Sequence, residues 1–207
     1  MRLAASLPAK KPQSMPNTMF PIFLKMDQIQ TLVVGGGNVA LEKASAILRN
    51  SPEANLTLVA PFFRPETIEY LQDFPQVKLH ERPFQPSDLV GLDLIICATD
   101  SPELHAEIKA LAAAQHLLCN VADTPPLCDF YLGSIVQKGD LKIAISTNGK
   151  SPTLAKRIRA FLEDVIPEDI QTSLDQLEAA RKNLKGDFQE KITQLNELTK
   201  NLIFKKK

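Results

Sequence analysis

The clearest hydrophobic pattern in this chain is a short apolar run that leads into three consecutive glycines. Residues 31–34 are apolar or β-branched, the glycines occupy 35–37, and small or branched apolar residues then recur at helical spacing over 40–48. This order predicts a strand, a tight turn and a helix that packs on the strand.

Four more runs predict four further strands, at 55–60, 77–81, 93–98 and 117–121. The run at 77–81 is more polar than the others, so we expect it near an edge of the sheet. Helical segments separate the strands: one from Pro65 to Leu71, a short turn capped by Ser87, and one from Ser101 to about Gln115. Strands that alternate with helices form a parallel sheet with right-handed crossovers. We therefore predict an α/β fold of the Rossmann type.

The alternation stops after residue 123. Two strands, 130–136 and 141–146, are predicted to pair around a turn at 138–140, and Ser151 then caps a helix that begins at Pro152. The rest of the chain has helical periodicity, with Gly186 between two helices. This second region is too small to bury its apolar faces alone, so we expect it to complete a homodimer.

These patterns predict four parts. They are a disordered extension (1–18), a dinucleotide-binding Rossmann domain (19–123), a central dimerisation segment (124–150) and a helical domain (151–207).

Composition excludes several classes of function. The chain has 207 residues, and its 24 Lys and Arg balance its 24 Asp and Glu, so its charge does not indicate a nucleic-acid partner. No apolar run approaches the ~20 residues that span a bilayer, and 1–18 lacks the apolar core of a signal peptide. The three cysteines match neither C-x-x-C nor zinc spacing. We expect a cytoplasmic protein with reduced thiols.

The glycine turn predicts a dinucleotide site of the form G-x-G-x-x-A. In this motif Gly35 permits the turn, Gly37 lets the backbone approach a pyrophosphate, and Ala40 keeps the helix close to the sheet. Free N–H groups at the helix start offer an anion site. The same turn also occurs in domains that bind no dinucleotide, so the motif alone leaves both interpretations open. The candidates here are Gly35, Gly36, Gly37, Asn38 and Val39.

Ligands of an open parallel sheet bind beyond the carboxyl ends of its strands, which adds further cofactor candidates. Ala60 and Pro61 end the second strand, and Thr99 and Asp100 end the fourth. Thr99 and Asp100 could equally be ordinary strand-end and helix-cap residues.

The second strand lacks the acid that usually binds the ribose hydroxyls of NAD. No Asp or Glu occurs between Ala54 and Pro65, whereas Arg64 lies nearby. By this rule alone the site leans towards NADP.

Two groups of residues are candidates for chemistry and substrate binding. Asp123 ends the fifth strand, although Asp-Thr-Pro-Pro is also a good turn sequence. Lys150, Lys156, Arg157 and Arg159 gather around the helix start at Ser151, where they could hold several carboxylates. A solvated helix face would explain the same cations.

From Phe20 to about Glu163 the chain resembles the precorrin-2 dehydrogenase / sirohydrochlorin ferrochelatase family, the dehydrogenase module of siroheme synthase. The segments that resemble it are Pro21–Leu24, Val33–Ala40, Cys97–Asp100, Cys119–Asp123, Cys128–Phe130, Ile143–Pro152, Leu154–Ala155 and Arg159.

The resemblance implies NAD-dependent oxidation of precorrin-2 to sirohydrochlorin by an interlocked homodimer, and in some members the insertion of ferrous iron as well. It implies that Asp123 is the catalytic carboxylate and that the basic cluster meets a macrocycle with eight carboxylates. We predict NAD as the cofactor. The predicted substrate-binding residues are Asn120, Lys150, Ser151, Lys156 and Arg159.

The chain departs from the family in a few places. Lys156 stands where arginine is usual, and Phe62 stands where many members have an acid. The fused methyltransferase module is absent, so another protein is expected to methylate uroporphyrinogen. The three histidines form no metal-ligand spacing, and no metal site is predicted.

Two other functions stay open. One is a dehydrogenase that acts on another polyanionic substrate. The other is a nucleotide-sensing Rossmann module that dimerises and has no turnover.

Overall fold

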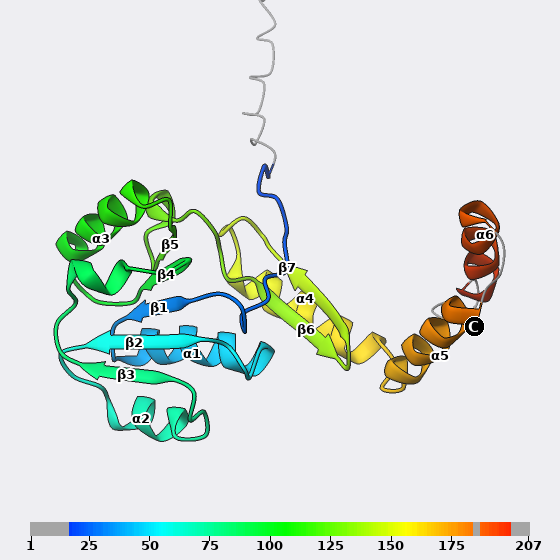
Figure 1. The fold of residues 1–207 in the computed structure, drawn as a ribbon, viewed down its shortest axis with the longest axis horizontal. Helices are drawn as coiled ribbons and strands as arrows, with labels where there is room; N and C mark the ends of the chain where they lie inside the picture. The colour runs from blue at the N-terminus through cyan, green and yellow to red at the C-terminus, as the bar shows by residue number, and fades with distance from the viewer. Residues whose placement is uncertain (1–16, 184–186, 200–207) are drawn as a thin grey trace, which may run out of the picture.

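The computed structural model describes residues 17–183 and 187–199 (Figure 1). The predicted extension therefore lies almost wholly outside the described residues, and so does the predicted break between helices at Gly186. Within the described ranges the chain forms a five-stranded sheet, a two-stranded hairpin and a series of helices that leads away from both.

The sheet is parallel throughout, with the strand order β3-β2-β1-β4-β5. Val34 at the end of β1 lies opposite Val59 on one side and Cys97 on the other, so the strands end at the same level. This is the Rossmann order, and the predicted α/β fold is confirmed. The strands are β1 (Thr31–Val34), β2 (Leu56–Ala60), β3 (Lys78–Glu81), β4 (Leu94–Cys97) and β5 (Leu118–Val121).

Helices cover the two faces of the sheet through separate apolar clusters. On one face α1 (Asn38–Asn50) and α2 (Pro65–Leu71) pack on side chains such as Val33. On the other face α3 (Pro102–Ala114) packs on residues such as Leu32. The alternation along β1 follows from the two-residue period of a strand.

The connection from β3 to β4 is a short 3-10 helix, η1 (Pro86–Leu89). The prediction that Ser87 caps this turn is wrong, because the cap is Gln85. The Asp88 carboxylate accepts the backbone N–H of Gln85 at 2.8 Å and is also paired with Arg82, which fixes the start of the turn two residues earlier.

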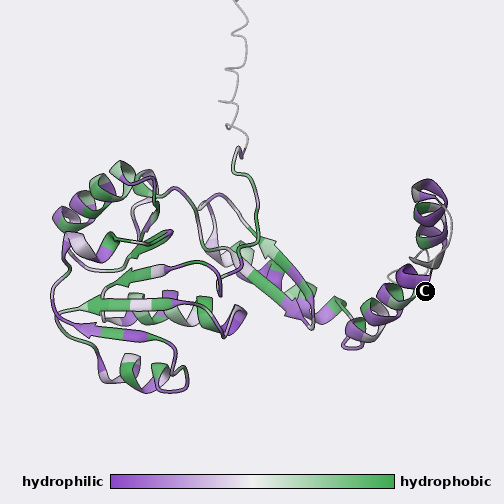
Figure 2. Cartoon of the chain, viewed as in Figure 1, coloured by the Kyte–Doolittle hydropathy of each residue, from purple (hydrophilic) through white to green (hydrophobic). Residues whose placement is uncertain are grey.

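Strand β3 is the polar edge of the sheet, as predicted. All four of its residues are exposed, and within the described ranges the strand pairs only with β2. Figure 2 shows its hydrophilic character beside the apolar β1 and β2. Charged residues on a free edge discourage pairing with other chains.

The hairpin is shorter at its start than predicted. Strands β6 (Ser134–Lys138) and β7 (Leu141–Ile145) are antiparallel and follow a 3-10 turn, η2 (Pro125–Leu127). Residues 130–133 do not belong to β6, because Asp129 and Phe130 are hydrogen-bonded to β5. The backbone N–H of Asp129 donates to the Cys119 carbonyl at 2.8 Å, and the Asn120 amide donates to the Phe130 carbonyl at 2.7 Å.

Three helices follow the hairpin: α4 (Pro152–Val165), α5 (Ile170–Asn183) and α6 (Phe188–Thr199). Helix α4 packs against the hairpin, with buried Ala155 on the helix and Val136 on β6. Helices α5 and α6 lie far from the five-stranded sheet (Figure 1). In the described part of the chain, no helix is long and apolar enough to cross a bilayer.

Two lysines join the hairpin to its neighbours. Lys142 of β7 donates to the backbone carbonyl of Asn50, the last residue of α1. Lys138 of β6 donates to the Ile166 carbonyl at 2.7 Å and pairs with Glu168, both in the link between α4 and α5. The hairpin therefore connects the sheet to the C-terminal helices.

Candidate active site

The glycine turn is built as the motif requires. Gly35 has φ +136°, and a Cβ atom there would lie 2.3 Å from the Ala98 carbonyl oxygen, so only glycine fits between β1 and β4. Ala40 is fully buried against the sheet, as predicted. The predicted roles of Gly35 and Ala40 in the turn thus agree with the geometry.

Gly37 leaves an open space at the start of α1. Among the residues that the structure describes, a Cβ atom placed there would meet nothing within 4 Å, and no side chain caps the helix. Its first turn contains no acidic residue. The N–H groups of this turn, which begins with Asn38 and Val39, are thus free to face an anionic ligand.

Gly36 fixes the turn to the loop that follows β2. Its carbonyl oxygen accepts two hydrogen bonds, from the Arg64 backbone N–H at 3.0 Å and from the buried Thr67 hydroxyl at 3.1 Å. A Cβ atom at Gly36 would lie 2.1 Å from the Phe62 carbonyl oxygen. Ala60 and Pro61, predicted to contact the cofactor, begin this loop. The sequence did not reveal the contribution of Thr67.

The end of β4 is held by a histidine. The Nε2 atom of His105 lies 2.9 Å from the Thr99 hydroxyl oxygen, which also accepts the Ser101 backbone N–H at 3.3 Å. His105 is buried, and this burial lowers its pKa. Thr99 and the exposed Asp100 therefore occupy the carboxyl edge of the sheet beside the glycine turn.

Asp123 lies in a tight turn directly after β5. The Thr124 N–H donates to the Val121 carbonyl at 3.2 Å, and Asp123 between them has φ +57°. This left-handed conformation is uncommon for residues other than glycine and is seen most often with Asn and Asp. The side chain is exposed, and none of the described residues donates a hydrogen bond to its carboxylate. The carboxylate is therefore available to a ligand.

The loop after Asp123 is clamped to β5. The Cys128 thiol donates to the Val121 carbonyl at 3.1 Å and accepts the Val121 N–H at 3.3 Å. Asp129 accepts the Cys119 N–H at 2.9 Å and binds Lys109 of α3 through both carboxylate oxygens at 2.6 Å. This network holds the Asp123 turn in one place relative to the sheet.

Asn120 belongs to the same clamp. It is buried, and its amide nitrogen donates to the Phe130 carbonyl and contacts the Cys128 sulfur at 3.5 Å. Its predicted contact with substrate stays a prediction, because the side chain already has a structural role. The sequence did not reveal the structural role of Asn120 in this clamp.

The cysteines are free thiols, as expected. Cys97 and Cys119 are fully buried on neighbouring strands. A hydrogen bond with Cys119, together with burial, raises the pKa of the Cys97 thiol. A buried protonated thiol is a packing group, not a nucleophile.

The predicted substrate-binding residues near α4 form a group apart from the sheet edge. Ser151 caps the helix as predicted, and its hydroxyl oxygen accepts the Leu154 N–H at 3.1 Å. Lys150 and Lys156 are exposed, whereas the Nε atom of Arg159 lies 3.4 Å from the Glu163 carboxylate. Across the described residues, no hydrogen bond or ion pair joins these cations to Asp123.

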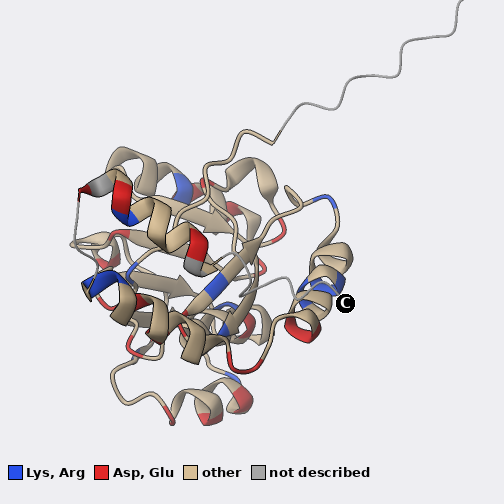
Figure 3. Ribbon diagram, turned by 90° about the vertical axis from the view of Figure 1, so that its right-hand side faces the viewer, with Lys and Arg blue, Asp and Glu red and all other residues tan. Residues whose placement is uncertain are grey.

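Charge is mixed on the side of the molecule that Figure 3 presents. Figure 3 shows basic and acidic positions interleaved along the helices and loops of one side. Within the ranges that the structure describes, no group of three or more His, Cys, Asp or Glu residues is arranged to hold a metal ion.

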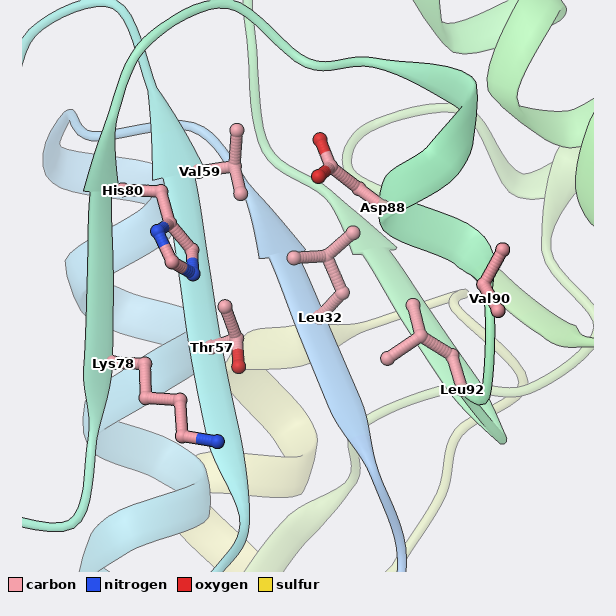
Figure 4. Close-up of a pocket in the computed structure, with 8 residues that line it drawn as sticks. All are labelled: Leu32, Thr57, Val59, Lys78, His80, Asp88, Val90 and Leu92. Atoms are coloured by element: carbon pink, nitrogen blue, oxygen red, sulfur yellow. The ribbon is translucent and has the colours of Figure 1, made fainter.

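A shallow hollow of about 210 Å³ lies on the sheet face beside η1 (Figure 4). It was not predicted, and it arises where the four-residue η1 takes the place of a full crossover helix and leaves part of β2 and β3 uncovered. Asp88 at its rim is bonded to Arg82, which lowers the pKa of the Asp88 carboxyl. Its lining residues are Leu32, Thr57, Val59, Lys78, His80, Asp88, Val90 and Leu92.

These features fit a nicotinamide dinucleotide at the carboxyl edge of the sheet. The open space at Gly37 and the uncapped start of α1 suit a pyrophosphate, and the ends of β2 and β4 flank this position. The exposed Asp123 carboxylate lies after β5, beyond β4 on the same edge.

Comparison with protein families gives two matches along the chain. Residues 22–134 match the family described as putative NAD(P)-binding. Residues 138–164 match the family described as sirohaem biosynthesis protein central. The first match covers more than half of the chain, and the second covers the hairpin turn and most of α4.

Several siroheme synthases are similar in sequence. That of Pseudoalteromonas atlantica is 39% identical over 169 residues, which are 82% of this chain and 36% of that protein. That of Nitrosococcus oceani is 40% identical over 148 residues, 72% of this chain and 31% of that protein. The chain therefore spans about a third of the length of these curated relatives.

A solved structure of SirC, a precorrin-2 dehydrogenase, has a similar fold. It superposes with a TM-score of 0.69 at 26% sequence identity and covers 89% of this chain and 92% of that chain. The likeness therefore includes the sheet, the hairpin and helices beyond it.

Proposed function

Because the chain belongs to the family described as putative NAD(P)-binding and also matches the sirohaem biosynthesis protein central family, we propose that it oxidises precorrin-2 to sirohydrochlorin with NAD as the hydride acceptor. The observation that supports this most is the turn at Asp123, where a free carboxylate follows β5 on the edge of the sheet that carries the glycine turn. The similarity to SirC over most of both chains supports the same reaction.

The residues of the glycine turn would hold the cofactor. The free N–H groups at the start of α1 bind the pyrophosphate, and the ends of β2 and β4 contact the two nucleotide halves. When bound, the nicotinamide ring supplies the acceptor for a hydride from the substrate. Thr99, which is hydrogen-bonded to His105, is in a position to orient the nicotinamide half of the cofactor.

Asp123 is the proposed proton acceptor. Loss of a hydride from a reduced macrocycle leaves a proton to be removed, and a carboxylate can take it directly or through one water molecule. The clamp formed by Cys128 and Asp129 keeps the turn rigid, so the carboxylate need not be reoriented during the reaction.

Lys150, Lys156 and Arg159 are proposed to bind the carboxylates of the substrate. The two lysines are exposed, and the Ser151 cap places the first N–H groups of α4 beside them. Arg159 would exchange its contact with Glu163 for a substrate carboxylate. Arginine suits such a contact because its planar group can bind two oxygens at once.

The proposed active form is a homodimer. Several large apolar side chains are exposed in the single chain, among them Phe161 at 63% and Val165 at 56% on α4, and Phe20 at 86% and Phe23 at 68% before β1. Exposed apolar groups of this size indicate a surface that another chain covers. Sedimentation velocity at micromolar concentration would give a single species of twice the chain mass; a monomer would contradict the dimer.

The dehydrogenase is tested by incubating the protein with precorrin-2 and NAD and recording the absorption spectrum of sirohydrochlorin. We expect enzyme-dependent formation of sirohydrochlorin with one NADH for each turnover. Absence of turnover with both NAD and NADP would contradict the proposal and favour the nucleotide-sensing alternative.

Ferrous iron insertion is a second candidate activity. It is favoured by the free Asp123 carboxylate, which could also take protons from pyrrole nitrogens. The macrocycle supplies the four nitrogen ligands itself. Anaerobic incubation of sirohydrochlorin with ferrous iron, compared with the rate without protein, tests it; equal rates would exclude this activity.

A further inference from the structure

Arg64 places a free cation beside the glycine turn. Its backbone N–H is bound to the Gly36 carbonyl, and its Nη1 atom lies 3.4 Å from the side-chain oxygen of Asn38, the first residue of α1. The side chain is exposed, and no carboxylate in residues 17–183 or 187–199 forms an ion pair with it. A guanidinium has five N–H donors, so one long contact to a neutral amide leaves most of them unused.

The surroundings of Arg64 lack the group that would exclude a phosphate. In NAD sites an acid near the end of β2 binds the ribose hydroxyls and repels a 2′-phosphate. Here the chain from Asn55 to Arg64 contains no acid, and Phe62, at 64% exposure, occupies the loop. Glu66 follows in the first turn of α2, but it forms no ion pair with Arg64. Arg64 is therefore the only charged residue between Asn55 and Pro65.

The position of Arg64 relative to the sheet suits the adenosine half of a dinucleotide. Strand β2 lies next to β1, and Arg64 is the N-cap residue of α2, four residues after Ala60 at the end of β2. The contact with Asn38 places the guanidinium at the same helix start that would hold the pyrophosphate. An arginine there can meet the 2′-phosphate on the neighbouring ribose.

We infer that Arg64 binds the 2′-phosphate of NADP, so that the site accepts NADP as well as NAD. The inference rests on the dinucleotide site of the proposed function. It adds a specificity-determining residue on the adenosine side, away from the reacting atoms. The phosphate replaces the Asn38 amide as the partner of the guanidinium, and a contact with a neutral acceptor becomes an ion pair.

Titration calorimetry with two fragments tests the inference without any substrate. The probes are adenosine 2′,5′-bisphosphate and AMP, which differ only in the 2′-phosphate. We expect the wild-type protein to bind the bisphosphate more tightly, and Arg64→Gln to weaken that binding roughly tenfold or more while AMP affinity changes less than about threefold. Arg64→Lys, which keeps the charge and loses the planar fork, should fall between the two.

Arg49→Gln is the matched control, because Arg49 is exposed at the other end of α1. It should leave both affinities unchanged. Equal binding of the two probes by the wild type, or an equal loss of both in Arg64→Gln, would overturn the assignment of Arg64. Binding of NAD without a preference for the 2′-phosphate would overturn only this inference, whereas failure to bind both NAD and NADP would overturn the proposed function as well.

Discussion

The imidazole of His105 and the hydroxyl of Thr99 are hydrogen-bonded at 2.9 Å, which joins the first turn of α3 to the end of β4. The contact lies at the edge of the sheet where the cofactor is proposed to bind. Because the Thr99 oxygen already accepts the Ser101 N–H, its own proton is free for a neutral imidazole. A protonated imidazole has no lone pair to accept it.

This contact predicts a dependence of stability on pH. Burial lowers the pKa of His105, while the nearby Asp100 acts in the opposite direction more weakly. A histidine whose folded pKa is lowered contributes stability that is complete above its unfolded pKa of about 6.5 and is lost as the pH falls through its folded value. We therefore expect the free energy of unfolding to decrease below about pH 6.5.

Urea unfolding at several pH values, for the wild type and for His105→Gln, checks this dependence. Glutamine keeps a hydrogen-bond acceptor but does not titrate. The variant should therefore lose less stability than the wild type when the pH falls from about 8 to about 5, a range that spans the unfolded histidine pKa of about 6.5. Parallel pH profiles for the two proteins would show that His105 is not the group responsible.

Two glycines of the turn are expected to respond differently to alanine. Gly35→Ala should lower the free energy of unfolding by roughly 2–4 kcal/mol, because the residue has φ +136° and its Cβ would collide with the Ala98 carbonyl. Gly37→Ala has open space and should change stability by less than about 1 kcal/mol. Its effect should instead be weaker NAD binding, since the methyl group enters the space proposed for the pyrophosphate.

Chemical denaturation and NAD titration of both variants separate these effects. Unchanged NAD affinity in a folded Gly37→Ala protein would show that the pyrophosphate does not approach this residue. An undiminished stability of Gly35→Ala would show that β1 and β4 can move apart at the turn.

Asp123→Asn should remove most turnover and preserve the fold. Asparagine tolerates the left-handed backbone at φ +57°, so the turn is retained while the base is lost. Removal of a general base typically lowers the rate by roughly 10²–10⁴. Sirohydrochlorin formation is the readout, with circular dichroism and NAD binding as controls. A folded variant that binds NAD and keeps near-normal turnover would remove Asp123 from the mechanism.

The serine caps of α3 and α4 form a matched pair for stability. Ser101 and Ser151 each precede a proline and accept the N–H of the residue three positions later, at 3.2 Å and 3.1 Å. Replacement of either by alanine should cost about 1 kcal/mol. Thermal unfolding should show the loss, whereas the corresponding change to Asp should retain the cap. If Ser151→Ala affects only substrate affinity, its hydroxyl binds ligand instead of capping the helix.

The sheet and its helices were predictable because their periodicity is local. The apolar run before Gly35, the caps at Ser101 and Ser151, and the polar edge strand β3 all have short-range signals. Even the role of Gly35 followed from its place in the motif.

The details around Asp123 were not predictable, because they depend on contacts between distant residues. Lys109 and Asp129 lie 20 positions apart and belong to no motif spacing. Phe130 and Leu132 have the apolar character of a strand, but the preceding segment bonds to β5, so the pairing of β6 begins at Ser134. The contact of Arg64 with Asn38 likewise forms only when the start of α2 packs beside the start of α1.

The strand order also determines how the protein can form during its synthesis. Strand β1 emerges first and ends in the centre, β2 and then β3 add on one side of it, and β4 and then β5 add on the other. Each strand after β1 therefore finds one neighbour already translated when it leaves the ribosome. Growth outward from one central strand lets the sheet assemble in the direction of translation.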